Sequence, residues 1–144
     1  MNSTEVKIFL VEDNEGDIIL TLEALKEAKV LNNVQVVKDG EAALKYLRKE
    51  GVYKDAATPD LILLDINLPR VDGITVLTEI KNDPVLSSIP VIMLTTSNAE
   101  KDIQQSYQQH ANCYITKPVE YPKFMEVVLK IKDFWISIVK LPKR

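Results

Sequence analysis

The chain has 144 residues and a net charge of −3; 46% of the residues are hydrophobic and 27% are charged, which suits one domain with a substantial core. The negative charge gives no support for direct nucleic-acid binding. No run reaches the roughly 18 apolar residues of a membrane span, and the opening MNSTEVK lacks the pattern of a signal peptide, so we expect a cytoplasmic protein. The single cysteine, Cys113, lies in an apolar stretch and is expected to be a small core residue.

Short apolar runs alternate with amphipathic segments along the chain. The apolar runs predict five strands, at Val6–Val11, Val34–Val37, Leu61–Leu64, Pro90–Leu94 and Asn112–Ile115. Apolar residues spaced three and four apart predict five helices, at Asp17–Lys29, Glu41–Lys49, Gly73–Asn82, Ser97–Gln109 and Glu120–Val139. The first of these is expected to bury Ile18, Leu22, Leu25 and Ala28. Strands that are mostly continuous apolar runs are typical of a parallel sheet covered on both faces, so we predict a doubly wound α/β domain. The longest connection, Arg48–Pro59, is expected to be a mobile loop.

Polar residues follow four of the predicted strands. They are Glu12-Asp13 after the first strand, Asp65 after the third, Thr95-Thr96-Ser97 after the fourth and Thr116-Lys117-Pro118 after the fifth. Binding sites in open parallel sheets form at the carboxyl ends of the strands. If these strands are neighbours, three carboxylates, several hydroxyls and one lysine meet at one edge of the sheet.

The residue types in this set indicate metal-assisted phosphoryl chemistry. Three carboxylates repel one another, and Mg²⁺, which prefers oxygen ligands, relieves that repulsion. With one Mg²⁺ and Lys117, the charges of the three acids would be balanced. A carboxylate such as Asp65 can also act as a nucleophile and form an aspartyl phosphate. Taken singly, each residue has an ordinary structural role; Glu12 and Asp13, for example, could interact with the dipole of the first helix.

Taken together and in order, Glu12-Asp13, Asp65, Thr95 and Lys117-Pro118 resemble the site of response regulator receiver domains, which are CheY-like. The resemblance covers nearly the whole chain, and the loop LPRVDG after Asp65 also fits it. It implies a flavodoxin-like (βα)5 fold, a five-stranded parallel sheet in the order 2-1-3-4-5. It implies Asp65 as the phosphoacceptor.

The same resemblance implies a Mg²⁺ site made by Asp13, Asp65, the backbone carbonyl of Asn67 and, through water, Glu12. It implies that Lys117 and Thr95 contact the phosphoryl oxygens, with the backbone of Thr96 and Asn67 beside them. Thr95 and Tyr114 would be the switch residues, and the peptide between Lys117 and Pro118 would be cis. His110 stands where the family often has glycine, and it is not placed for catalysis.

The segments NCYITKP and FWISIVKLP are similar to the single-domain response regulators that are paired with cyanobacterial phytochromes. This narrower resemblance implies a histidine kinase, a bacterial phytochrome, as the phosphodonor; the downstream protein is unknown. We expect a short tail at 1–5, a receiver domain with an extended final helix at 6–140, a basic tail at 141–144 and no output domain.

The final helix carries more apolar surface than one sheet face needs. The stripe expected to face the sheet consists of Phe124, Val127, Val128, Ile131, Phe134, Trp135 and Ile138. A second strip contains Met125, Leu129 and Ile136, and it widens the apolar arc to roughly 220°. Either this second strip packs on neighbouring helices, or it forms a homodimer or partner surface with the fourth helix and fifth strand; the resemblance favours the surface.

Three functions are compatible with parts of this pattern. The first is a phosphorylation switch that changes the face formed by the fourth helix, fifth strand and fifth helix; such a protein is not an ordinary enzyme, although it catalyses its own phosphotransfer and slow autodephosphorylation. The second is a phosphatase similar to haloacid dehalogenases, which have a DxD pattern on the first strand where this chain has EDN. The third is an interaction module that needs no phosphorylation. The complete acceptor set favours the first function.

Overall fold

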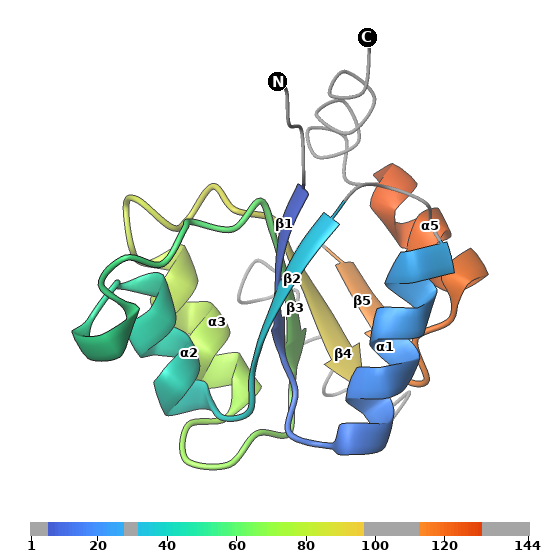
Figure 1. Cartoon of the computed structure of the whole chain (residues 1–144), viewed down its shortest axis with the longest axis horizontal. Helices are drawn as coiled ribbons and strands as arrows, with labels where there is room; N and C mark the ends of the chain where they lie inside the picture. Colours follow the sequence, from blue (N-terminus) through green and yellow to red (C-terminus); the bar gives the residue numbers. More distant parts are fainter. Residues whose placement is uncertain (1–5, 28–31, 97–112, 131–144) are drawn as a thin grey trace, which may run out of the picture.

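Figure 1 shows the computed structural model, which describes residues 6–27, 32–96 and 113–130. The strands are β1 (Val6–Val11), β2 (Asn32–Val37), β3 (Leu61–Asp65), β4 (Val91–Thr95) and β5 (Cys113–Thr116). The helices are α1 (Glu15–Glu27), α2 (Gly40–Leu47), α3 (Gly73–Lys81) and α5 (Tyr121–Lys130), with a short 3₁₀ helix η1 (Gly51–Tyr53). All strand pairs are parallel, and the sheet order is β2-β1-β3-β4-β5. The predicted doubly wound fold is therefore confirmed.

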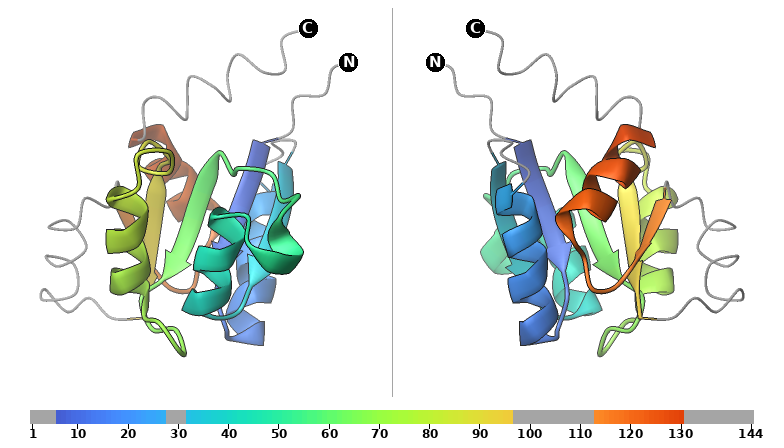
Figure 2. Two further views of the ribbon diagram at one scale, coloured as in Figure 1. Left: turned by 90° about the vertical axis from the view of Figure 1, so that its left-hand side faces the viewer. Right: turned by 90° about the vertical axis from the view of Figure 1, so that its right-hand side faces the viewer.

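The sheet is the middle of three layers: α1 and α5 cover one face, and α2 and α3 cover the other (Figures 1 and 2). Successive side chains of a strand point to opposite faces, and β3 follows this rule. Leu61 and Leu63 join the core cluster under α1 and α5, whereas Ile62 and Leu64 join the cluster under α2 and α3. The continuous apolar run before Asp65 thus reflects a central strand that is buried on both faces.

Helix α1 begins at Glu15, two residues earlier than the periodicity predicts. Asn14 causes this earlier start because it satisfies two of the N–H groups that open the helix. Its Oδ1 accepts a hydrogen bond from the N–H of Asp17 at 2.9 Å, and its carbonyl accepts one from the N–H of Ile18 at 2.9 Å.

The buried stripe of α1 also differs from the expected one. Leu22 is 37% exposed, so its predicted burial is wrong, whereas Ile18 and Leu25 are buried as predicted. Thr21 is fully buried in the stripe instead, and its hydroxyl donates to the carbonyl of Asp17 at 2.8 Å. A threonine is tolerated inside because this bond satisfies its one polar group.

Two segments, the start of β2 and the connection that contains η1, are more regular than the sequence predicts. β2 begins at Asn32 because the backbone of this edge strand pairs with β1 from Val6 onward, whatever its side chains are. The connection expected to be a mobile loop contains η1, and the Tyr53 ring lies edge-on to Tyr46 with 5.4 Å between the ring centroids. Tyr46 in turn stacks on Phe9 at 4.3 Å, so this part of the connection is attached to the core.

Some predictions lie outside the described residues. They concern Ala28, the helix at 97–109, His110, the side chain of Val128, the final helix beyond Lys130, and both tails. Cys113 is buried in the core, as predicted. Within the three described stretches, no helix is long and apolar enough to cross a membrane.

The loop between β3 and α3 is held close to the sheet by two glycines. The N–H of Gly73 donates to the carbonyl of Ile66 at 2.8 Å, and a Cβ at position 73 would lie 2.1 Å from the carbonyl oxygen of Asp65. The N–H of Gly40, in the first turn of α2, donates to the carbonyl of Pro69 at 3.3 Å, and a Cβ there would lie 1.9 Å from the carbonyl oxygen of Val71. Side chains larger than hydrogen would push this loop away from Asp65.

Candidate functional site

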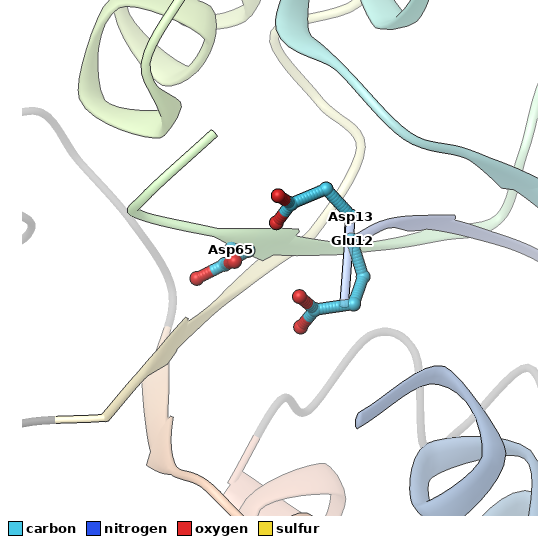
Figure 3. Close-up of side chains that lie close together, drawn as sticks. All are labelled: Glu12, Asp13 and Asp65. Carbon is cyan, nitrogen blue, oxygen red and sulfur yellow. The ribbon is translucent and has the colours of Figure 1, made fainter. Parts of the chain in front are cut away.

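Three acidic side chains meet at the carboxyl ends of β1 and β3. Glu12 and Asp13 follow β1, Asp65 ends β3, and one carboxylate oxygen from each lies within 4.8 Å of the others (Figure 3). Glu12 and Asp65 are buried, whereas Asp13 is exposed. Since β1 and β3 are hydrogen-bonded neighbours, the sheet order itself brings these residues together.

Lys117 lies in the same group, directly after β5. Its ammonium donates to Glu12 Oε1 and to Asp17 Oδ2, each at 3.0 Å, and lies 3.3 Å from Asp65 Oδ2. Its backbone N–H donates to the carbonyl of Thr95 at 2.7 Å, which ties the end of β5 to the end of β4. The side chain is only 6% exposed, so it makes these interactions largely out of solvent. The peptide bond between Lys117 and Pro118 is cis.

The pKa values of Glu12 and Lys117 are both shifted. Burial raises the pKa of Glu12 to about 7, and the charge of Asp65 adds to the increase, although the hydrogen bond from Lys117 opposes it. Burial alone would lower the pKa of Lys117, but its hydrogen bonds to Asp17 and Glu12 and the charge of Asp65 outweigh burial and raise that pKa above its usual value. Lys117 is thus held in its charged form, while Glu12 can take up a proton near neutral pH.

Asp17 is the residue that the sequence reasoning missed. An acid in the first turn of a helix is ordinarily explained by the helix dipole, so nothing in its spacing indicates a contact with Lys117. Asp17 changes the expected charge balance, because the group now contains four carboxylates and one ammonium. Three of these carboxylates lie within 3.3 Å of the ammonium, and Asp13 belongs to the group through Glu12 and Asp65. One divalent cation would therefore leave this group with a net charge of −1 when every acid is ionised.

A hydrogen bond and an ion pair orient the two oxygens of the Asp65 carboxylate. Oδ1 accepts from the N–H of Asn67 at 3.2 Å, and Oδ2 faces the ammonium of Lys117. A buried carboxylate requires such partners, since an unpaired charge in the interior costs several kcal/mol. Asp65 is buried, but it is not buried alone.

The remaining predicted site residues occupy the neighbouring strand ends. Thr95 is buried at the end of β4, and Thr96 next to it is exposed. Tyr114 on β5 is partly buried and packs against the core cluster under α2 and α3. Met125 on α5 packs against the other core cluster, which favours the alternative that its strip is internal. The structure does not describe the side chain of Leu129 or any part of Ile136, so the other two members of the strip are not tested.

The donor set fits a hard divalent cation. Carboxylate oxygens are the ligands that Mg²⁺ and Mn²⁺ prefer, and the mutual repulsion of Glu12, Asp13 and Asp65 would be relieved by a double positive charge. Asp13 is exposed and can bind a cation directly from solvent. The same arrangement places a buried, oriented carboxylate next to a lysine, as aspartyl phosphate formation requires.

Comparison with known proteins identifies the family to which this arrangement belongs. The family model of the response regulator receiver domain matches residues 8–129. Response regulator Rcp1 of Synechocystis sp. is 44% identical over 135 residues, which cover 94% of this chain and 92% of Rcp1. The structure of the phosphorylated cyanobacterial phytochrome response regulator RcpA is similar, with a TM-score of 0.79 and 52% identity over 96% of this chain and 99% of that chain. Rcp1 in its Mn²⁺-bound form gives a TM-score of 0.78 and 43% identity, over 96% of this chain and 99% of that chain.

The chain belongs to the family of response regulator receiver domains. Its similarity to Rcp1 and RcpA extends over almost their whole length, so within the family it resembles the response regulators of phytochromes. The resemblance seen in the sequence is thus confirmed. Receiver domains of this group act in two-component phosphorelays with histidine kinases and bind a divalent metal. The family assignment excludes the phosphatase similar to haloacid dehalogenases.

Proposed function

We propose that this chain is a phosphorylation switch in which Asp65 accepts a phosphoryl group from a histidine kinase, a bacterial phytochrome, in a Mg²⁺-dependent step. One observation carries the proposal: Asp65 is buried at the end of β3, 3.3 Å from the ammonium of Lys117 and next to Glu12 and Asp13. An interaction module that works without phosphorylation would have no need of this complete set.

In the proposed transfer, an oxygen of the Asp65 carboxylate attacks the phosphorus of a phosphohistidine. The bond between phosphorus and the histidine nitrogen breaks, and the nitrogen keeps the electron pair and takes up a proton. Asn67 and Lys117 orient the attacking side chain before the donor arrives, which lowers the entropy cost of the reaction. The lysine is also placed to stabilise the charge on the transferred phosphoryl group, with the hydroxyl of Thr95 and the backbone of Thr96 beside it.

Asp13, Asp65 and the carbonyl of Asn67 would hold Mg²⁺, with Glu12 acting through a water. The cation supplies positive charge to the phosphoryl oxygens when it is bound. The Mn²⁺-bound structure of Rcp1 supports a divalent cation in this group of proteins, and the all-oxygen donor set supports Mg²⁺ in this chain.

The switch would follow from the new charge on Asp65. We propose that Thr95 moves toward the phosphoryl group. Tyr114, which lies on β5 two residues before Thr116, the pairing partner of Thr95, would then turn inward and change the face that the resemblance assigns to the fourth helix, β5 and α5. The aspartyl phosphate would then hydrolyse slowly by attack of water, which resets the switch.

The resemblance also supports proposals about organisation and partners. The receiver would span 6–140, between a short tail at 1–5 and a basic tail at 141–144. It would act in the cytoplasm and signal to a downstream protein by docking. Because Met125 packs against the core, the proposed homodimer surface would have to come mainly from the other two members of its strip, Leu129 and Ile136. A dimer in sedimentation experiments with or without a phosphoryl analogue would support this surface, and a monomer in both conditions would overturn it.

The central test uses Asp65→Asn, with Asp60→Asn as its matched control. Asp60 lies at the opposite, amino end of β3, is exposed, and accepts a hydrogen bond from the N–H of Lys7 at 2.8 Å. With a small phosphodonor and Mg²⁺, we expect phosphoryl uptake in the wild type and in Asp60→Asn and none in Asp65→Asn. Unchanged uptake in Asp65→Asn would overturn the proposal. A panel of phytochrome and other histidine kinases then tests the donor.

A further inference from the structure

Asp17 is a carboxylate that contacts Lys117 but has no role in the proposed transfer. Its Oδ2 is 3.0 Å from Lys117 Nζ, although 100 positions separate the two residues in the chain. Its side chain is 25% exposed, so it lies at the border between the site and solvent. The contact joins the first turn of α1 to the end of β5.

The backbone of Asp17 is fixed on both sides. Its N–H donates to Asn14 Oδ1 at 2.9 Å, and its carbonyl accepts from the hydroxyl of Thr21 at 2.8 Å. These bonds set the direction in which the carboxylate leaves the helix. Glu15, in the same turn, is the useful contrast, because it is exposed and pairs with Lys38 away from Lys117. The helix dipole accounts for an acid at either position, but it does not account for the contact of Asp17 with Lys117.

The lysine has as many acidic neighbours as its ammonium has N–H donors. An ammonium has three N–H groups, and Glu12, Asp17 and Asp65 each place an oxygen within 3.3 Å of Nζ. Glu12 and Asp65 also belong to the acidic cluster that fits a cation, whereas Asp17 does not. Asp17 is therefore the one of these acceptors that stays available to Lys117 when a cation draws on the other two.

We propose that Asp17 is a positioning residue: it holds the ammonium of Lys117 to one side of the cluster of Glu12, Asp13 and Asp65. A divalent cation can then bind the cluster while the lysine stays within reach of Asp65. Without Asp17, the ammonium moves toward Glu12 and Asp65 and competes with the cation for the same oxygens. The inference rests on the proposed function of this site and adds a residue to it.

The test is a double-mutant cycle read out by the affinity of the full chain for Mg²⁺ alone, measured by titration calorimetry. We expect Asp17→Asn to weaken Mg²⁺ binding about tenfold, the lower end of the effect of outer-shell partners on metal affinity. Glu15→Gln removes one negative charge from the same helical turn but leaves Lys117 untouched, and we expect a change of less than about twofold, since the charge is exposed and screened.

The second arm of the cycle uses Lys117→Met as the background. If Asp17 acts through the lysine, Asp17→Asn will change Mg²⁺ affinity in this background no more than Glu15→Gln does. An equal loss in both backgrounds would overturn the inference, because Asp17 would then act on the cation through space or through the fold. Asp17→Glu keeps a carboxylate at the same turn and is expected to retain most of the wild-type affinity; a loss as large as that of Asp17→Asn would also count against the inference.

The double-mutant cycle and the test of the proposed function can fail separately. Phosphoryl uptake that does not depend on Asp65 would overturn the phosphoacceptor assignment but leave the coupling between Asp17 and Lys117 standing. Additive effects on Mg²⁺ affinity together with Asp65-dependent uptake would overturn only the role of Asp17.

Discussion

Replacing Lys117 by methionine should destabilise the protein strongly without metal and much less with it. The ammonium is almost fully buried and is the shared partner of Glu12, Asp17 and Asp65. Methionine fills a similar volume but carries no charge, so the variant isolates the electrostatic role of the lysine. Removing one partner of a buried ion pair typically costs about 3 to 5 kcal/mol, since it leaves a charge uncompensated in the interior.

Two features of the site place the expected loss at the lower end, about 3 kcal/mol. The Asp17 carboxylate is 25% exposed and can be solvated when the lysine is gone. The pKa of Glu12 is raised to about 7, so this acid can take up a proton instead of remaining charged. Asp65 is buried beside Glu12 and Asp13, so water cannot readily replace the lysine next to it. A saturating divalent cation would supply positive charge at the same place and recover most of the loss.

The measurement is urea unfolding of wild type and Lys117→Met, each in EDTA and in saturating Mg²⁺. Lys38→Met is the matched control, because Lys38 forms an exposed ion pair with Glu15 and should change the free energy of unfolding by less than about 0.5 kcal/mol in either condition. An equal loss for Lys117→Met with and without Mg²⁺ would refute the reasoning, because the lysine and the cation would then not share the same carboxylates.

Two further predictions concern the surroundings of this site. The raised pKa of Glu12 means that, in EDTA, the folded state keeps a proton between about pH 4.5 and 7 that the unfolded state has lost. The free energy of unfolding should therefore fall as the pH rises through this window. Glu12→Gln should remove that part of the pH profile, and an unchanged profile would contradict the burial of Glu12. Gly40→Ala places a methyl group 1.9 Å from the carbonyl oxygen of Val71 and should lower the free energy of unfolding in urea by about 2 kcal/mol. Ala42→Gly, in the same helix, is the control and should lower it by no more than about 1 kcal/mol. An unchanged free energy of unfolding in Gly40→Ala would show that the loop moves aside without strain.

The central strands could be predicted because strands that are buried on both faces have apolar residues at every position. Leu61–Leu64 is apolar at every position, and every one of these side chains is fully buried, on alternating faces of the sheet. The strand ends followed from the same runs, and parallel order then brought Asp65 to Glu12 and Asp13. The edge strand β2 was harder, because Asn32 and Asn33 belong to it by backbone pairing with β1 and carry no apolar signal.

The errors arose where a local hydrogen bond replaced a hydrophobic contact. Periodicity assigned Leu22 to the interior, but Thr21 takes the buried position because its hydroxyl bonds to the carbonyl of Asp17. A scale of hydrophobicity cannot register such a bond. Asp17 was not predicted as a site residue for a related reason. Its place in the first turn of a helix is enough to account for an acid there, and its contact with Lys117 depends on a residue 100 positions away in the chain.

The charges of the site argue that cation binding precedes phosphoryl transfer. Four carboxylates and one ammonium give a net charge of −3, or −2 when Glu12 is protonated, and either value repels an anionic phosphodonor. The lysine cannot offset this charge alone, because its contact with Asp17 already pairs one negative charge with its single positive one. A divalent cation adds two positive charges beside Asp65, and a charged Glu12 binds it better than a protonated one does. If the proposed function holds, these acids make the cation a condition of phosphoryl transfer, and the pairing of Asp17 with Lys117 strengthens that condition.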